Sequence, residues 1–272
     1  MRLRTEFVDG ERGRLFTLTR APSAKPRDTV LVIPPFAEEM NKSRRMVAST
    51  TAALAESGVG SICVDLHGTG DSDGEFAEAS WDLWIRDLDA VAQRSAERGA
   101  PVTRLLATRL GCQLAAAYLR HRKTSVTRCV FWQPVAEGAR YIDQFLRLRL
   151  ASSLLGDTSK ETLSGLREKL RTAGTLEVGG YGLSSGLAQS IGELRLVELL
   201  GDVPVSIDWI DVVRSLDAAT PAVSAQCAQA LRASGREVRA ARIVGEPFWA
   251  SVEIVLLPEL CALTVKLLGA DP

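Results

Sequence analysis

The stretch that decides the fold is Leu105-Leu106-Ala107-Thr108-Arg109-Leu110-Gly111-Cys112, an apolar strand that turns at once into a helix. Two small residues, Ala107 and Gly111, stand two positions before and two positions after Arg109. A strand and a helix approach each other closely at such a turn, so the turn tolerates little side-chain bulk beside its apex. This spacing is typical of a nucleophile elbow, and it predicts Arg109 at the apex.

Apolar strands and amphipathic helices alternate on both sides of this elbow, as expected of a mostly parallel sheet covered by helices on both faces. The chain begins differently, because residues 3–8 and 15–19 alternate around a short turn and predict an antiparallel hairpin. The later predicted strands are 29–33, 60–65, 102–108, 129–133, 204–212 and 237–244, and the helices are 43–57, 81–98, 111–122, 221–234 and 257–268. The fold class is therefore α/β, with residues 1–272 forming a single domain.

The alternation fails over residues 135–203, where the sequence is helical in character and interrupted by glycines. We interpret this segment as a helical cap inserted over the sheet. Its first helix, residues 141–155, places Tyr141, Phe145 and Leu148 on one apolar face with arginines elsewhere around it. A basic amphipathic helix of this kind can lie on a membrane surface, but covering a cleft is the commoner use and is the interpretation we favour.

Composition excludes several classes of function. Lysine and arginine number 33 and aspartate and glutamate also number 33, so no long-range field attracts nucleic acid or an anionic bilayer. No apolar stretch approaches the roughly 20 residues of a membrane span, and the charged N-terminus does not resemble a signal peptide. The five cysteines are widely scattered, and no two of them form a Cys-x-x-Cys motif. This pattern argues against a disulfide framework and a metal site and favours a reducing, cytoplasmic location. We expect no cofactor.

The apex residue restricts the chemistry of the elbow. A guanidinium stays protonated and has no lone pair for an acyl carbon, so Arg109 cannot act as a covalent nucleophile. Arginine at a helix N-terminus can instead bind a carboxylate or a phosphate. An alternative is that Arg109 pairs with Glu38 or Glu39 and is purely structural.

The chain also offers no convincing partner for a Ser-His-Asp triad. It contains two histidines: His67 lies in a glycine-rich loop, and His121 ends an arginine-rich helix, where a cation suits the helix dipole. Pro247 stands at about the position after the last strand where a catalytic histidine would be sought.

The remaining triad candidates are weak for similar reasons. Asp211 and Asp217 are expected to be surface carboxylates, because no histidine is available for either to orient. Cys112 lies just inside the helix without a basic partner, and a buried, unactivated thiol is inert.

Ligands of open α/β sheets bind beyond the carboxyl ends of the strands, so the residues that end the strands predict the pocket. They combine aromatic walls with a few polar groups, which suits a small acyl or anionic molecule. The predicted ligand-binding residues are Phe36, Asn41, Arg109, Trp132, Gln133 and Trp249, with Glu38 and Glu39 forming a charged floor beside Arg109.

The run Pro35-Phe36-Ala37-Glu38-Glu39-Met40-Asn41-Lys42-Ser43-Arg44-Arg45, with Phe131-Trp132-Gln133-Pro134 and Gly180-Tyr181-Gly182-Leu183-Ser184, resembles one branch of the α/β-hydrolase superfamily. This branch is the second hydrolase-like protein associated with the exosortase A system. Its members occur beside genes for exopolysaccharide production and for sorting proteins with a PEP-CTERM tail, and they carry arginine at the elbow. Two positions depart from the pattern: Pro34 stands where histidine is expected, and Ala107 replaces the usual first glycine.

The resemblance implies an α/β-hydrolase fold and an ester or thioester substrate, with an acyl-carrier or exopolysaccharide-pathway partner. Two hypotheses follow. In the first, a hydrolase attacks its substrate with water directly, using Glu38 or Glu39 as general base and Arg109 to stabilise the oxyanion. In the second, the fold has lost its catalysis and binds an anionic acyl or phosphate ligand at Arg109. The orientation of the two glutamates discriminates between them.

Overall fold

Eight strands form one sheet, in the order β1-β2-β4-β3-β5-β6-β9-β10, in a computed structural model that describes residues 1–26, 28–122, 124–153, 161–217 and 221–269. The β1–β2 hairpin is antiparallel and β2 joins β4 antiparallel, whereas the other neighbours pair in parallel. The predicted sheet and its N-terminal hairpin are confirmed. The strands are Arg2–Gly10 (β1), Gly13–Ala21 (β2), Thr29–Ile33 (β3), Gly60–Val64 (β4), Val102–Thr108 (β5), Arg128–Trp132 (β6), Ser206–Val213 (β9) and Val238–Val244 (β10).

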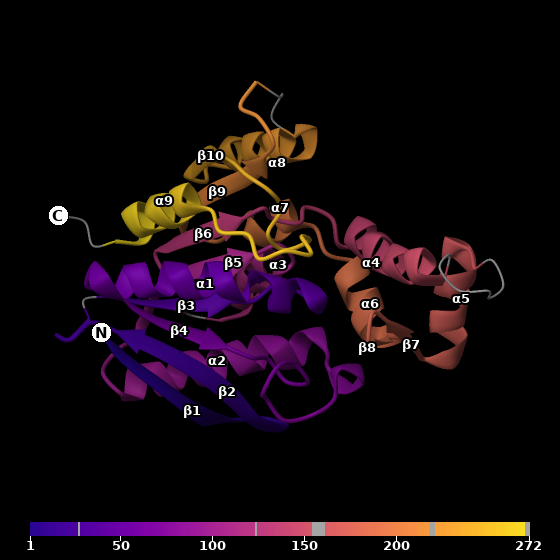
Figure 1. Ribbon diagram of the computed structural model, residues 1–272, viewed down its shortest axis with the longest axis horizontal. Helices are drawn as coiled ribbons and strands as arrows, with labels where there is room; N and C mark the ends of the chain where they lie inside the picture. The colour runs from indigo at the N-terminus through magenta and orange to yellow at the C-terminus, as the bar shows by residue number, and fades with distance from the viewer. Residues whose placement is uncertain (27, 123, 154–160, 218–220, 270–272) are drawn as a thin grey trace.

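Helices cover both faces of this sheet, which explains the nearly continuous apolar runs of its central strands. All five residues of β3 are buried. Helices α1 and α9 lie side by side on one face (Figure 1), where Met46 and Leu260 join one apolar cluster. The other face packs against α2, α3 and α8. The helices are Glu38–Glu56 (α1), Trp81–Glu97 (α2), Gly111–His121 (α3), Ala222–Ala233 (α8) and Pro258–Leu268 (α9), with a short 3₁₀ turn at Phe76–Glu78 (η1).

Most of the inserted segment, from α4 to α6, forms a lobe beyond one end of the sheet, on the right of Figure 1, whereas its last helix, α7, packs against α3 and α8. It contains a β-hairpin that the sequence analysis interpreted only as glycine interruptions of helix. Gly179 and Gly180 both have positive φ, 58° and 85°, as a two-residue hairpin turn requires. The elements of the segment are Gly138–Ser153 (α4), Leu163–Ala173 (α5), Thr175–Val178 (β7), Tyr181–Ser184 (β8), Ser185–Gly192 (α6) and Leu196–Leu200 (α7).

Aromatic packing attaches this lobe to the sheet. Tyr141 and Phe145 of α4 contact Phe36, in the loop after β3, with ring centroids 5.9 and 5.1 Å apart. Leu146 of α4 is fully buried, whereas Leu148, expected on the apolar face, is 41% exposed. The apolar face of α4 therefore contains Tyr141 and Phe145 as expected but Leu146 in place of Leu148, and it covers the carboxyl ends of the strands.

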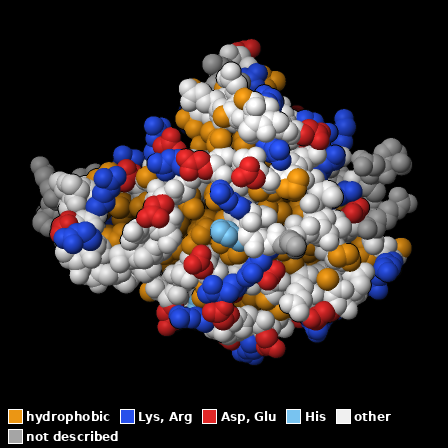
Figure 2. Space-filling model, turned by 180° about the vertical axis from the view of Figure 1, so that it is seen from behind, with side chains coloured by type: hydrophobic (Ala, Val, Ile, Leu, Met, Phe, Trp, Pro, Cys, Tyr) orange, Lys and Arg blue, Asp and Glu red, His pale blue; other side chains and the backbone are white. Residues whose placement is uncertain are grey.

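The surface carries both signs of charge. Figure 2 shows basic and acidic side chains interspersed over the back of the molecule, in keeping with the equal totals of the sequence. Among the described residues, no helix is long and apolar enough to cross a membrane.

A substitution at Gly111 tests how closely helix α3 approaches the loop after β3 at the elbow. A Cβ at this position would lie 2.4 Å from the carbonyl oxygen of Pro34, a backbone atom that cannot move without shifting the loop after β3. We expect Gly111→Ala to lower the free energy of unfolding by about 1–3 kcal/mol, as overpacking does. Gly186→Ala in α6 is the matched control, because no atom lies within 4 Å of its Cβ. Equal stability of the two variants in urea unfolding would contradict the predicted clash.

Candidate active site at the Arg109 elbow

The elbow has the predicted geometry. Strand β5 ends at Thr108, helix α3 begins at Gly111, and Arg109 between them has φ 56°. This left-handed conformation is unfavourable for residues other than glycine, and it occurs where the surrounding structure enforces it. The Arg109 amide donates to the carbonyl of Trp132 at 2.9 Å, and the amide of Cys112 donates back to the Arg109 carbonyl at 3.1 Å.

The guanidinium of Arg109 is held on several sides. Its Nε donates to Oε1 of Glu39 at 3.2 Å, and its Nη1 donates to the carbonyl of Gln133 at 3.4 Å. The rings of Tyr141 and Trp249 lie 5.7 and 5.2 Å from the guanidinium carbon, within the range of cation–π attraction. The apex therefore presents a cation enclosed by a carboxylate and two aromatic rings.

Both carboxylate oxygens of Glu39 accept hydrogen bonds at this site. Its second oxygen, Oε2, accepts from the hydroxyl of Tyr141 at 3.0 Å. The side chains of Arg109 and Glu39 are only 14% and 11% exposed, so the pair is largely buried. Burial raises the pKa of Glu39, and the Arg109 charge and the Tyr141 hydrogen bond oppose this effect. Burial also raises the pKa of the Tyr141 hydroxyl, which stays protonated and donates.

Glu38 behaves differently from its neighbour. It is half-buried in the first turn of α1, and among the described residues its Oε2 has no hydrogen-bond partner. Burial raises the pKa of Glu38, opposed by its own backbone amide and by the charge of Lys42. One of the two candidate glutamates thus pairs with Arg109, and the other does not.

Trp249 belongs to the loop after the last strand of the sheet. It follows β10 on the loop where the sequence analysis looked to Pro247, and its ring lies over Arg109. Phe248 packs edge-on against Trp249 at 5.0 Å and against Trp132 at 5.8 Å. The elbow apex and the loop after the last strand therefore meet, through the contact between the Arg109 guanidinium and the Trp249 ring.

Several predicted pocket residues make structural contacts within the fold. Trp132 has no exposed surface, and its Nε1 donates to Thr264 at 2.9 Å, so it belongs to the core. The side-chain oxygen of Gln133 accepts from the amide of Val212 at 2.7 Å and links β6 to β9. Phe36 is 3% exposed, within the aromatic packing beneath the cap. Strand alternation and loop conformation, which the sequence pattern does not fix, turn these side chains inward.

Asn41 is exposed and holds the cap rather than lining the floor of the elbow. Its Nδ2 donates to the hydroxyl of Tyr181 at 3.2 Å, and its Oδ1 accepts from Nε of Arg44 at 3.2 Å. The β8 strand of the cap is thereby tied to α1.

A cavity of about 200 Å³ opens beside the guanidinium. It lies between the elbow, the loop after β6 and the first turn of α4, and Val223 of α8 closes one side. Tyr141, Glu137 and Arg140 line it, although the sequence analysis did not place them in a site. Their position at the start of a cap helix could have suggested that they lie near the site. The direction in which that helix points depends on tertiary packing, which the sequence pattern does not show.

The remaining triad candidates lie in other environments. His67 is buried in the loop after β4, where its amide donates to Oδ2 of Asp87 at 2.9 Å and its carbonyl accepts from Trp84 Nε1 at 3.1 Å. His121 is exposed at the end of α3, as predicted. Cys112 is buried with its thiol on the Ala107 carbonyl at 3.3 Å, and burial raises its pKa, so it is not activated.

The prediction of a surface location for Asp211 was wrong. This carboxylate is 2% exposed and accepts from Trp209 Nε1 at 3.1 Å and from the Ser224 hydroxyl at 2.9 Å. It fastens β9 to α8. Asp217 lies in the loop after β9, where its amide donates to the Ser215 hydroxyl at 3.1 Å.

The fold and the elbow define a class of protein. The sequence model of the serine aminopeptidase S33 family, a hydrolase family, matches residues 24–172, more than half of the chain. The chain belongs to this family. Its elbow nevertheless carries Arg109. No curated protein matches the chain.

Solved structures agree on the fold. The chain is similar to the esterase Est1E from Butyrivibrio proteoclasticus with bound ferulic acid, with a TM-score of 0.70 at 13% identity over 97% of this chain and 100% of that chain. It is also similar to the thioesterase domain from the curacin biosynthetic pathway, with a TM-score of 0.61 at 16% identity over 99% and 100% of the two chains. An esterase domain from a Rhodothermus marinus protein gives 0.64 at 14% identity over 99% and 97%. These likenesses establish the α/β-hydrolase fold.

The buried ion pair predicts a thermodynamic coupling. Arg109→Met leaves the Glu39 carboxylate buried without its cation, and we expect the free energy of unfolding to fall by about 3 kcal/mol. The double variant Arg109→Met/Glu39→Gln removes the uncompensated charge and should lose less. Arg171→Met, at an exposed pair with Glu168, is the control and should change stability little. Additive effects of the two substitutions at the elbow would show that the pair is not coupled.

Asp87, which supports the His67 loop, predicts a pH dependence. Burial raises the pKa of Asp87 from its ordinary value near 3.8 to about 6, so the folded state holds its proton more tightly than the unfolded state. Stability contributed by this group is therefore present below about pH 4 and is lost as pH rises to about 6. Relative to Asp87→Asn, the wild type should lose up to about 3 kcal/mol across that window in urea unfolding. Asp82→Asn, an exposed carboxylate of the same helix, is the matched control.

Proposed function

We propose that this chain is an α/β-hydrolase-fold protein that binds a small acyl or anionic ligand beside Arg109 and forms no covalent acyl intermediate. The observation that carries the proposal is the buried Arg109–Glu39 pair at the elbow apex. A hydrolase of this fold needs an ionisable oxygen or sulfur at that point, and a guanidinium supplies only donors.

The cavity beside the elbow supports a ligand of limited size. Its volume of about 200 Å³ suits a short acyl carboxylate or a single phosphate group better than a large substrate. Nε and Nη1 of Arg109 are engaged, while among the described residues Nη2 has no hydrogen-bond partner. Arg140, which is exposed and pairs with Glu137 at 2.9 Å, adds a second guanidinium at the rim. An oxyanion could therefore bind between the two arginines.

The biological setting we propose comes from the sequence resemblance alone. The run from Pro35 to Arg45 resembles the second hydrolase-like protein of the exosortase A system, so the ligand would belong to exopolysaccharide production linked to PEP-CTERM sorting. An acyl-carrier or exopolysaccharide-pathway protein would then be its partner. The compartment would be the cytoplasm, where five unpaired cysteines stay reduced.

One observation favours a second candidate, an ester or thioester hydrolase. The Oε2 of Glu38 has no hydrogen-bond partner among the described residues, and burial raises the pKa of this carboxyl group towards that of a useful general base. In this mechanism Glu38 takes a proton from water, the hydroxyl oxygen attacks the acyl carbon, and Arg109 stabilises the oxyanion. The alcohol or thiol then leaves with a proton from Glu38.

Ligand binding and turnover separate the two candidates. Under the binding proposal, p-nitrophenyl butyrate and butyryl-coenzyme A are not hydrolysed above the buffer blank, and a fluorophosphonate probe adds no mass to the protein. Butyrate or inorganic phosphate at about ten times its Kd should raise Tm by roughly 3 °C, because binding then stabilises the folded state by about 1.4 kcal/mol. Arg109→Met should abolish this shift, and Arg171→Met should retain it.

Other outcomes contradict the binding proposal. Turnover that is present in the wild type and lost in Glu38→Gln would establish the hydrolase instead. A covalent adduct with the fluorophosphonate would overturn both mechanisms, because neither contains a nucleophilic side chain. The absence of turnover, adduct and thermal shift together would leave Arg109 with a structural role only.

A further inference from the structure

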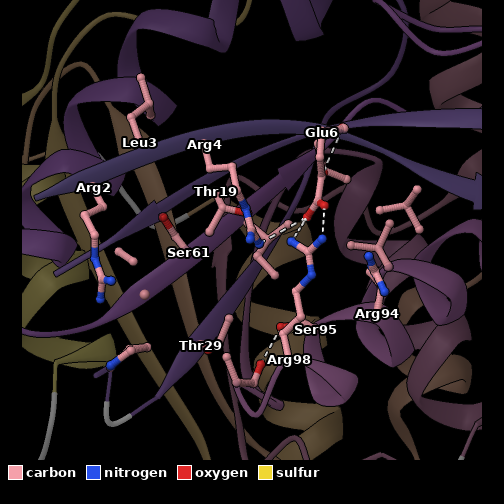
Figure 3. Close-up of a pocket in the computed structure, with 18 residues that line it drawn as sticks. Arg2, Leu3, Arg4, Glu6, Thr19, Thr29, Ser61, Arg94, Ser95 and Arg98 are labelled. Atoms are coloured by element: carbon pink, nitrogen blue, oxygen red, sulfur yellow. Dashed lines mark hydrogen bonds and ion pairs between the residues drawn. The ribbon is translucent and has the colours of Figure 1, made fainter. Parts of the chain in front are cut away.

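A second cavity lies at the opposite end of the sheet from the elbow. Its volume is about 850 Å³, and we call it the basic groove. It lies where β3 and β4 begin, under the β1–β2 hairpin and beside the C-terminal half of α2. The elbow is at the carboxyl end of β5, so the basic groove is separate from the site of the proposed function. Figure 3 shows its lining residues.

Four arginines line this groove. Arg2 and Arg4 come from β1, Arg94 lies in the last turn of α2, and Arg98 is the residue directly after that helix. Among the described residues that line the groove, Glu6 is the only one with a carboxylate. A cleft of this size with several positive charges has a positive electrostatic potential and attracts anions.

The single carboxylate is shared. Arg98 donates from Nη1 to Oε1 of Glu6 at 2.5 Å and also pairs with Oε2, while Arg4 Nη2 lies 3.2 Å from the same Oε1. Figure 3 shows both guanidinium groups directed at Glu6. One negative charge therefore balances two positive charges at the centre of the groove.

The remaining two arginines, Arg2 and Arg94, bring no further carboxylate into the groove. Among the described residues, Arg2 donates to the neutral carbonyl oxygens of Pro22 and Ala24, each at 3.4 Å, and forms no ion pair. Arg94 pairs with Glu97 at 3.4 Å, but Glu97 does not line the groove. The groove thus keeps an excess of positive charge at Arg2 and at the cluster of Arg4 and Arg98 around Glu6, with about the space that a ligand of nucleotide or sugar-phosphate size needs.

We propose that the basic groove binds a small molecule with two or more anionic groups, either phosphates or carboxylates. Arg4 and Arg98 would bind one group at the centre, in partial exchange for Glu6, and Arg2 would bind another. Planar guanidinium groups suit both oxyanions, because two parallel N–H donors match two oxygens. Thr19, which lies beside Arg4 in Figure 3, has a hydroxyl with no hydrogen-bond partner among the described residues and can donate to the same ligand.

Titration calorimetry with pyrophosphate and with citrate at low ionic strength tests this site. One equivalent should bind at the groove, in addition to any bound beside Arg109, and added salt should weaken the binding, as expected of an ionic contact. Arg4→Gln and Arg98→Gln should each weaken it by about tenfold or more. Glu6→Gln should tighten it, because it removes the competing carboxylate and leaves both arginines in place. A purely structural role for these arginines does not predict tighter binding.

Two controls locate the bound anion. Arg171→Gln alters an exposed ion pair in the cap, and Arg140→Gln alters the rim of the elbow cavity; neither should change the affinity. Preference for pyrophosphate or for citrate identifies the anionic group. The proposal is overturned if neither probe binds, if Arg140→Gln weakens binding as much as Arg98→Gln, or if Glu6→Gln lowers the affinity while its thermal unfolding matches the wild type.

Discussion

The buried ion pair between Arg109 and Glu39 is the constraint on which the rest of the site depends. It joins the elbow to the first turn of α1, and through the Tyr141 hydroxyl it reaches the cap. Removing two charges from water is costly, so such a pair persists only when further hydrogen bonds and packing compensate. The Gln133 carbonyl and the Trp249 ring supply part of that compensation.

The elbow of this hydrolase fold carries an arginine whose neighbours are a buried carboxylate and two aromatic rings. The apex still meets the loop after the last strand, but Trp249 brings an aromatic face to Arg109 at 5.2 Å. The candidate acid Asp211 is used to fasten β9 to α8. A fold supplies positions, and the side chains at those positions decide what reaction is available. Membership of a hydrolase family therefore fixes the scaffold more firmly than the mechanism.

The two ends of the sheet offer different environments. At the carboxyl end, Arg109 is matched by a buried carboxylate, and the rings of Tyr141 and Trp249 pack against its guanidinium. At the amino end, Arg4 and Arg98 share the single Glu6 in an open groove, and Arg2 has no acidic partner in that groove. Charge balance is thus local, because a chain with zero net charge still contains regions with an excess of one sign.

The sequence by itself determined the succession of strands and helices along the chain, the N-terminal hairpin and the elbow at Arg109. Apolar periodicity and small residues beside an apex are local properties, so a sequence pattern reveals them. Only the tertiary structure decided which glutamate would meet the arginine. Glu38 and Glu39 are about 100° apart on a helix, and the rotation of α1 against the sheet selects between them. The burial of Trp132 and the approach of Trp249 likewise depend on contacts between segments more than a hundred residues apart, which no local pattern encodes.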